Sequence, residues 1–340
     1  MPEIFQYQKA FLLESGSHLP GFHLAYTTYG NLNNVGDNVV WVFHALTANS
    51  EPAEWWPGLV GEEKIFDPAE YFIICVNMPG SCYGSIGPLD LNPETDKPYY
   101  HDFPFFTIKD MIKAYQYLKE FLGFKKIKVG IGGSMGGQQL IEWAVQEPEL
   151  FEFIIPIATN AIHSSWGVAF NESQRLSIEA DITWKEQNET AGIDGMKVAR
   201  SIALISYRNY ITYNSTQSEE SNEKFDNYKT SSYQRYQGEK LAKRFNAFSY
   251  YLLSKSMDSH NVGRHRNDVQ NALQQIRSKT LAIGITTDIL FPVNEQQFIA
   301  DNIAGGKFIS IHSNYGHDGF LLEFEQISKH INDLLLNESY

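Results

Sequence analysis

The chain contains little cysteine and little positive charge. Only two cysteines, Cys75 and Cys82, occur among its 340 residues, and they do not form a Cys-x-x-Cys pair. No disulfide framework is therefore expected, and a reducing compartment is favoured. Lysine and arginine total 27 against 40 acidic residues, which gives a formal net charge of −13. This balance argues against nucleic acid and anionic membranes as general partners.

Targeting, membrane and metal signals are also missing from the sequence. Residues 1–10 lack the basic and apolar regions of a signal peptide, and no apolar run approaches the length that crosses a membrane. The histidines do not have ligand spacing, and no Gly-x-Gly-x-x-Gly loop opens a helix. We therefore expect a cytoplasmic protein with no metal site and no permanently bound cofactor.

Short apolar runs alternate with helical patterns in the first half of the chain. This alternation is typical of an α/β fold with a mainly parallel sheet flanked by helices. The pattern returns near the C-terminus and is followed by an amphipathic helix with an apolar face from Phe320 to Leu335. The predicted strands are 39–43, 71–76, 127–131, 153–158, 280–285 and 307–311, and the clearest predicted helix is 107–122.

The middle of the chain has a different character. Strand-like runs become rare there, while helical stretches dominate, for instance at 198–213 and 239–257. We expect a helical lid over residues 166–274, inserted into a core made of residues 1–165 and 275–340. The most linker-like stretch, 214–227, falls inside this lid.

Ser134 is the strongest candidate for a reactive side chain. It stands in Gly132-Gly133-Ser134-Met135-Gly136-Gly137, directly after a predicted strand. This pattern is typical of a nucleophile elbow, in which a tight turn exposes the serine at the start of a helix. A phosphate-binding loop would instead end in Gly-Lys-Ser/Thr, and this one continues as Gln138-Gln139. The alternative is that Ser134 is merely small enough for the turn.

A serine nucleophile needs a base and an acid, and both follow in the order expected for this type of site. Asp288 stands just after the strand that ends at Ile285, and His317 follows the last strand between Gly316 and Gly319. The alternative interpretation of Asp288 alone is a helix N-cap. We select His317 over the other histidines because glycines place it in a loop beyond the strand.

An acyl-transfer site also needs backbone N–H donors for the oxyanion. Met135, at the start of the elbow helix, is expected to supply one. The loop His44-Ala45-Leu46-Thr47 after the first core strand is expected to supply the other, with Leu46 as the best candidate. His44 itself can serve to hold that loop by hydrogen bonds.

With these residues in view, the chain resembles the homoserine O-acyltransferase family of the α/β-hydrolase superfamily. The resemblance extends over nearly the whole chain and rests on many short motifs in family order. They are His44 to Thr47, Gly80 to Ser85 with Gly87-Pro88, Phe103-Pro104, Thr107 to Met111, Gly132 to Gln139 with Glu142 to Ala144, Gln174-Arg175 with Asp181 and Trp184, Tyr207-Arg208, Asp288 with Phe291-Pro292, and Gly316-His317-Asp318.

The resemblance implies an enzyme of methionine biosynthesis that moves an acyl group from acyl-CoA to the hydroxyl of L-homoserine through an acyl-serine. It assigns Ser134, Asp288 and His317 as the triad, and Leu46 and Met135 as the oxyanion donors. It further implies that Arg208 and Asp318 bind the amino acid, which is reasonable for a zwitterion. A homodimer formed through the lid is also implied.

Several alternatives stay open at this stage. The donor is expected to be acetyl-CoA, but succinyl-CoA is an alternative, and L-serine is an alternative acceptor. An esterase or thioesterase would use the same triad and the same acyl-enzyme. A non-catalytic relative of the fold is the remaining alternative, against which the complete set of Ser134, Asp288 and His317 argues.

Overall fold

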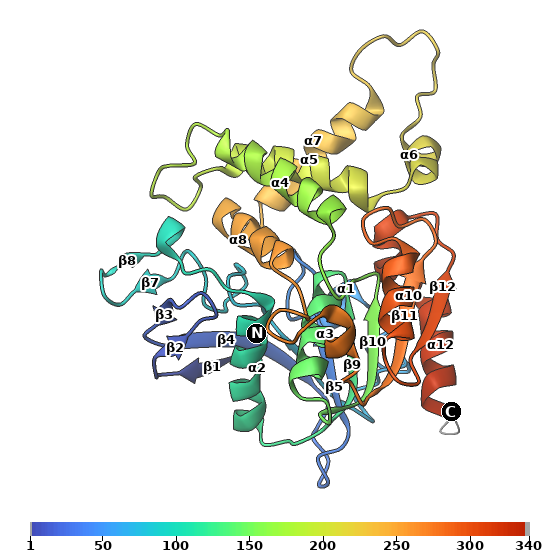
Figure 1. Ribbon diagram of the computed structural model, residues 1–340. Helices are drawn as coiled ribbons and strands as arrows, with labels where there is room; N and C mark the ends of the chain where they lie inside the picture. Colours follow the sequence, from blue (N-terminus) through green and yellow to red (C-terminus); the bar gives the residue numbers. More distant parts are fainter. Residues whose placement is uncertain (1, 337–340) are drawn as a thin grey trace.

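The structure is a computed structural model that describes residues 2–336 (Figure 1). Within this range, eight strands form one sheet in the order β1-β4-β6-β5-β9-β10-β11-β12. β1, β4 and β6 pair antiparallel, while β6, β5, β9, β10, β11 and β12 run parallel, so the predicted mainly parallel α/β sheet is confirmed. The bounds are β1 Glu3–Tyr7, β4 Phe22–Tyr29, β5 Val39–Phe43, β6 Phe72–Val76, β9 Ile127–Gly133, β10 Phe151–Ile157, β11 Lys279–Ile285 and β12 Lys307–Ile311.

The sheet is buried on both faces, as parallel strands require. Along β5, Trp41 and Phe43 pack into one apolar cluster, and Val40 and Val42 pack into a second cluster on the opposite face. The alternation follows from the two-residue period of a strand. A strand that is apolar at every position is therefore what a two-sided core demands.

Helices cover both faces. α2 and α3 contribute side chains to the cluster that contains Trp41, and α12 contributes Ile327 and Ile331 to the other. The helices outside the predicted lid are α1 Pro52–Trp55, α2 Ile108–Leu122, α3 Met135–Gln146, α10 Val293–Asp301, α11 Gly319–Leu322 and α12 Phe324–Leu336. Short elements complete this part: β2 Phe11–Leu12, β3 His18–Leu19, β7 Leu91–Asn92, β8 Lys97–Pro98, η1 Tyr100–Asp102 and η2 Gly316–Asp318.

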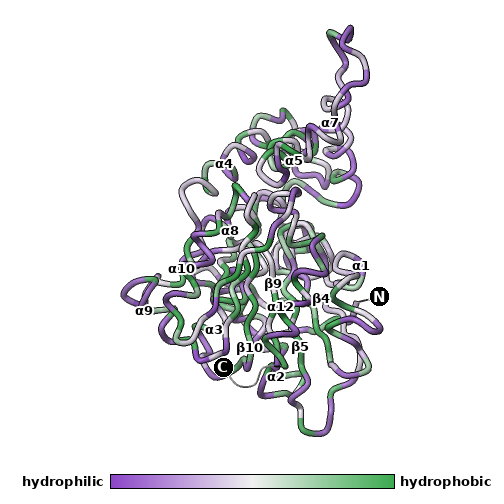
Figure 2. Tube along the Cα trace, turned by 90° about the vertical axis from the view of Figure 1, so that its right-hand side faces the viewer, coloured by the Kyte–Doolittle hydropathy of each residue, from purple (hydrophilic) through white to green (hydrophobic). Residues whose placement is uncertain are grey.

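Six helices lie in the segment that we predicted as the lid. They are α4 Ser165–Glu179, α5 Ile193–Tyr207, α6 Tyr210–Gln217, α7 Lys229–Ala242, α8 Ala247–Asp258 and α9 Val269–Leu273. α4, α5 and α7 lie together beyond one end of the sheet in both views (Figures 1 and 2). α5 also contacts η2, which carries His317. The exact lid boundaries, 166–274, stay a prediction.

Three predicted helices are interrupted in the structure. The stretch 198–213 breaks after Tyr207, because Arg208 is extended and the Asn209 side chain caps α6 by accepting a hydrogen bond from Ile211 N–H. The stretch 239–257 breaks before Asn246, which caps α8 in the same way. The C-terminal helix is divided into α11 and α12. Asparagine N-caps explain the first two breaks.

Candidate active site

Ser134 occupies a tight turn between β9 and α3, in a strained backbone conformation with φ 56° and ψ −127°. The neighbouring glycines are required by contact. A Cβ on Gly132 would lie 2.6 Å from the backbone of Gly136, and a Cβ on Gly136 would lie 2.1 Å from the carbonyl oxygen of Phe43. A non-glycine residue with positive φ is characteristic of functional sites. The local geometry is that of a nucleophile elbow.

The turn is held by hydrogen bonds to β10 and to the loop that follows it. Ser134 N–H donates to the Ile157 carbonyl at 3.0 Å, and Thr159 Oγ1 donates to the Ser134 carbonyl at 2.7 Å. Met135 is the first residue of α3, so its N–H has no partner within the helix. The positive end of the helix dipole thus lies beside the serine hydroxyl.

Asp288 and His317 are brought together from two loops that follow β11 and β12. Asp288 Oδ2 lies 2.6 Å from His317 Nδ1. Its Oδ1 accepts hydrogen bonds from Leu290 and Phe291 N–H, at 2.8 and 2.9 Å. α10 is capped by Pro292, so the alternative role of Asp288 as its N-cap is excluded. Both oxygens of the carboxylate are engaged, and one of them orients the imidazole.

Aromatic rings enclose the imidazole of His317. The ring of Phe291 stacks on it with centroids 5.1 Å apart, and Phe320 and Tyr207 lie at 5.2 and 5.7 Å. Gly316, directly before the histidine, has a φ of 64° that suits glycine. These contacts restrict the ring to one orientation, with Nε2 as the nitrogen that Asp288 leaves available.

Ser134 and His317 line the same small cavity of about 80 Å³. Leu46, predicted as an oxyanion donor, lies on the cavity wall. Asp318 lines it as well. The complete lining is Ala45, Leu46, Thr47, Ser134, Arg200, Tyr207, His317, Asp318, Phe320 and Leu321. Four of the residues selected from the sequence therefore line this cavity: Leu46, Ser134, His317 and Asp318. Met135 directly follows Ser134 in the chain.

His44 holds the loop that carries Leu46. Its Nε2 accepts a hydrogen bond from Met78 N–H at 3.1 Å, and its Nδ1 lies 2.9 Å from the Ala45 carbonyl. Burial lowers the pKa of His44 to about 4, so the ring is neutral near pH 7 and can accept at Nε2. The structure supports the interpretation that His44 holds this loop by hydrogen bonds.

Hydrogen bonds from Arg244 join the same loop to the lid, and we call this contact the Arg244 clasp. Arg244, between α7 and α8, donates through Nη1 to the Thr47 carbonyl at 2.6 Å and also to the hydroxyl of Tyr83. No sequence pattern indicates this contact, because the residues are far apart along the chain. The lid is therefore tied directly to the loop beside the cavity.

Arg208 and Asp318, which are predicted to bind the amino acid, lie against each other. Arg208 Nε is 2.9 Å from Asp318 Oδ2. Burial raises the pKa of Asp318, and the charge of Arg208 opposes that rise. Asp318 lines the 80 Å³ cavity, whereas Arg208 lines a neighbouring apolar cavity of about 530 Å³. Their expected roles in binding stay a prediction.

Two cavity residues were not assigned a role from the sequence. Arg200 and Tyr207 both come from α5 and both line the cavity with Ser134. They are seven residues apart, a spacing that places both on one helix face. Arg200 lies two helical turns before Tyr207, so the Tyr207-Arg208 motif together with helical spacing could have indicated it as a cavity residue.

Neither a metal-binding cluster nor a membrane-spanning helix is present in residues 2–336. No group of three or more His, Cys, Asp or Glu side chains in this range could hold a metal ion. No helix in the same range is long and apolar enough to cross a membrane.

Comparisons with known proteins agree on the fold and the family. The family described as "alpha/beta hydrolase fold" matches residues 38–324. Homoserine O-acetyltransferase of Cyclobacterium marinum is 51% identical over 325 residues, covering 96% of this chain and 92% of that protein. The homologous enzyme of Trichormus variabilis is 40% identical over 330 residues, with coverage of 96% and 92%.

Solved structures share the fold at lower identity. Homoserine O-acetyltransferase from Bacillus anthracis superposes with a TM-score of 0.90 at 23% identity, covering 98% of this chain and 97% of that one. Esterase E22 superposes with a TM-score of 0.89 at 24% identity, covering 98% and 99%. Since a transferase and an esterase match equally well, these superpositions establish the fold and leave the reaction to other arguments.

Proposed function

The chain belongs to the homoserine O-acetyltransferase family of α/β-hydrolase-fold enzymes, and on this premise we propose that it transfers the acetyl group of acetyl-CoA to the hydroxyl of L-homoserine. This reaction would serve methionine biosynthesis. The observation that carries the proposal is the 51% identity to a homoserine O-acetyltransferase over 96% of the chain. The shared cavity of Ser134 and His317 supplies matching chemistry.

In the first half-reaction, His317 Nε2 removes the proton of the Ser134 hydroxyl. The serine oxygen attacks the thioester carbonyl, and the N–H groups of Leu46 and Met135 stabilise the oxyanion. The tetrahedral intermediate collapses with cleavage of the carbon–sulfur bond, and His317 returns the proton to the leaving thiolate. Coenzyme A departs and leaves acetyl-Ser134. Asp288 is suited to stabilise the imidazolium formed on the way, because Oδ2 lies 2.6 Å from Nδ1.

In the second half-reaction, L-homoserine occupies the cavity and His317 removes the proton of its hydroxyl. Attack on acetyl-Ser134 forms the new ester bond, and the serine oxygen recovers the proton from the imidazolium. Arg208 and Asp318 are proposed to bind the amino acid. The bound amino acid and the lid are proposed to keep water from the acyl-enzyme.

We further propose a cytoplasmic homodimer that associates through the lid. Several large apolar side chains of the lid are exposed in the single chain, which supports an interface there. They include Val198 and Ile205 on α5, Tyr210 and Ile211 on α6, and Tyr236 on α7. Acyl-CoA would bind as a substrate rather than as a resident cofactor.

The proposed function is tested by thiol release from acetyl-CoA and from succinyl-CoA. Each donor is supplied with L-homoserine, with L-serine and without an acceptor, beside a Ser134→Ala control. We expect release that requires L-homoserine, favours acetyl-CoA and disappears in the variant. Equal release without an acceptor would indicate a thioesterase, and equal release with L-serine would overturn the assigned acceptor.

A further inference from the structure

Two short segments connect the lid helices α4 to α8 to the rest of the chain, and they pair with each other. Residues 160–163 lead from β10 into α4, and residues 260–262 lead out of α8. His163 N–H donates to the His260 carbonyl at 3.0 Å, and a second backbone hydrogen bond of the same length joins the segments. We call the two segments the hinge. Since both connections of these helices pass through it, the hinge fixes where they leave the core.

The side chain of His163 is buried in this hinge, where it contacts the lid and the elbow helix at once. Its Nδ1 lies 3.2 Å from Gln138 Nε2 on α3, and its Nε2 lies 3.3 Å from Asn171 Nδ2 on α4. A Cβ on Gly167 would lie 2.5 Å from the ring. The first turn of α4 therefore packs directly on the imidazole.

The ring of His163 is uncharged. Burial lowers its pKa to about 4, and the charge of Arg175 lowers it further, so the ring is neutral near pH 7. The Gln138 amide nitrogen also donates to Asn160 Oδ1 at 3.0 Å, which fixes the direction of that amide. A neutral imidazole has one acceptor nitrogen, and Nδ1 of His163 can therefore accept from Gln138.

Phe291 joins the hinge histidine to the catalytic histidine. Its ring centroid lies 5.7 Å from that of His163 and 5.1 Å from that of His317. Phe291 is fully buried, and its N–H donates to Asp288 Oδ1 at 2.9 Å. Because a protein interior is close-packed, a displacement of the His163 ring must displace Phe291 or leave a void beside it.

We propose that His163 is a positioning residue for the catalytic histidine: its ring supports Phe291, and Phe291 holds the imidazole of His317 in register with Ser134. This inference rests on the proposed role of His317 as the base in both half-reactions. Because α4 packs on the same ring, displacement of the lid would withdraw the support. A misplacement of about 1 Å at a catalytic group can cost about a hundredfold in rate.

The test is a double-mutant cycle of His163→Ala and Phe291→Leu. The rate constants for acetyl-enzyme formation and for transfer to L-homoserine are measured separately. We expect each substitution to lower both rate constants by about 10- to 100-fold, since His317 serves both steps. KM for each substrate should change little, because His163 does not line the reaction cavity. The double variant should be about as slow as Phe291→Leu alone, since His163 acts through Phe291.

A spectroscopic measurement observes the catalytic histidine itself. In protein labelled with 15N-histidine, the NMR signal of the His317 Nδ1 proton reports the contact with Asp288. We expect this signal to shift in His163→Ala. A substitution that only lowers the free energy of unfolding would leave the signal of the folded protein in place.

His260 provides a matched control within the hinge. It is also buried, but its Nε2 lies 3.1 Å from the Asn160 carbonyl, away from Phe291. His260→Ala should keep both rate constants, whatever stability it loses. If His163→Ala does not fold by circular dichroism, His163→Gln makes the same comparison, because it keeps an acceptor for Gln138 and removes the ring.

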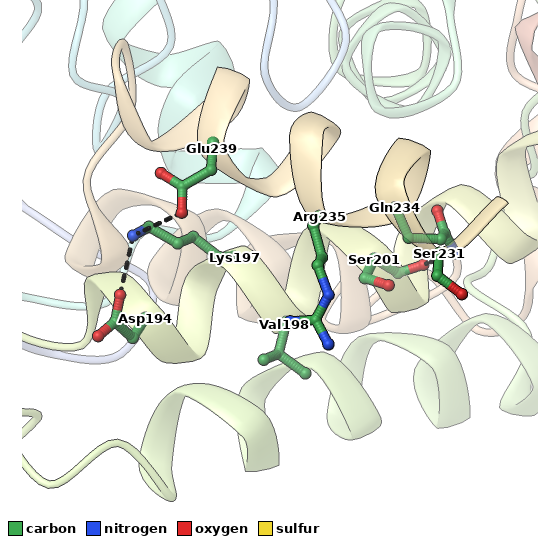
Figure 3. Close-up of a pocket in the computed structure, with 8 residues that line it drawn as sticks. All are labelled: Asp194, Lys197, Val198, Ser201, Ser231, Gln234, Arg235 and Glu239. Carbon is green, nitrogen blue, oxygen red and sulfur yellow. Dashed lines mark hydrogen bonds and ion pairs between the residues drawn. The ribbon is translucent and has the colours of Figure 1, made fainter. Parts of the chain in front are cut away.

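The groove between α5 and α7 provides a second control, in the lid and away from the hinge. There Lys197 pairs with Asp194 and Glu239 at 2.9 and 3.0 Å (Figure 3). Lys197→Met disturbs the contact of two lid helices without touching the hinge. It should therefore keep both rate constants and the NMR signal of His317.

Four results would overturn the inference. The first is a His163→Ala variant with both rate constants unchanged, and the second is additive losses in the double variant. The third is a loss confined to KM or to one half-reaction, which would indicate contact with a substrate. The fourth is an equal loss in His260→Ala, which would indicate a general loosening of the hinge. Failure of the unaltered protein to acetylate L-homoserine would instead overturn the proposed function, since it involves no variant.

Discussion

Asp288 Oδ2 lies 2.6 Å from His317 Nδ1, while Oδ1 of the same carboxylate accepts two backbone N–H groups from Leu290 and Phe291. Because every oxygen is engaged, the carboxylate cannot rotate without breaking several hydrogen bonds. The arrangement favours the tautomer with its proton on Nδ1. It leaves Nε2 as the nitrogen that can accept the proton of Ser134.

Asp288→Asn should preserve the shape of this contact but remove its charge and favour the wrong tautomer. We expect kcat to fall on the order of 10³- to 10⁴-fold. The measurement is steady-state acetyl transfer, with circular dichroism to verify the fold. Asp301→Asn, at the exposed C-terminus of α10, is the control and should retain full activity. A loss below about tenfold would show that the carboxylate is not needed for catalysis.

Gly136→Ala should damage the elbow. The added Cβ would lie 2.1 Å from the Phe43 carbonyl oxygen, so the strand or the helix must move. We expect a loss of about 1–3 kcal/mol in the free energy of unfolding and a larger proportional loss of activity, since Ser134 moves with the helix. Urea unfolding and kinetics measure both. Gly305→Ala, at φ +72° with nothing within 4 Å, should cost about 1–2 kcal/mol and leave activity intact.

Glu295 should make stability depend on pH. Burial chiefly raises its pKa to about 7 from 4.5, with the charge of Asp288 as a further cause. Between pH 4.5 and pH 7, Glu295 holds a proton in the folded state that it has lost in the unfolded state. The contribution of Glu295 to stability is therefore complete below pH 4.5 and is lost as pH rises through 7. Between pH 5 and pH 8, the free energy of unfolding of the unaltered chain should therefore fall by about 2–3 kcal/mol more than that of Glu295→Gln.

The measurement for Glu295 is urea unfolding of both proteins at pH 5 and pH 8. Glu325→Gln, in the first turn of α12, is the control and should show no such difference. A stability difference between Glu295→Gln and the unaltered chain that is the same at both pH values would refute the raised pKa.

Arg244→Met should loosen the loop that carries Leu46. The substitution removes the hydrogen bonds to the Thr47 carbonyl and to Tyr83. Because Arg244 is exposed, we expect a modest decrease of about threefold to tenfold in kcat/KM and little change in stability. Lys243→Met, the exposed neighbour, is the control. An Arg244→Met enzyme with unchanged kinetics would show that the Arg244 clasp does not position the loop that carries Leu46.

The sequence predicted the central strands well because burial on both faces leaves a strong signal. The strands 39–43 and 307–311 have the predicted bounds. The N-terminal strands β1 and β4 were not identified. Four of the five residues of β1 are exposed or intermediate, so its apolar pattern is weak. The break after Tyr207 was also missed, because apolar periodicity continues through a point that Asn209 interrupts by capping.

The parts of the candidate site that depend on local turns and on the order of the strands were predictable from the sequence. The flanking glycines indicate Ser134, and order along the strands indicates Asp288 and His317. Contacts between distant segments were not predictable. The pairing of Arg208 with Asp318 and the cavity position of Arg200 depend on how α5 packs against η2, and sequence spacing alone does not specify that packing.

The most direct measurement is the mass of the protein after mixing with acetyl-CoA in the absence of an acceptor, followed by peptide mapping. The account predicts one added acetyl group on the peptide that contains Ser134, its release on addition of L-homoserine, and no acetylation in Ser134→Ala. Rapid transfer to L-homoserine by a Ser134→Ala variant, or an acetyl group on a different residue, would contradict it.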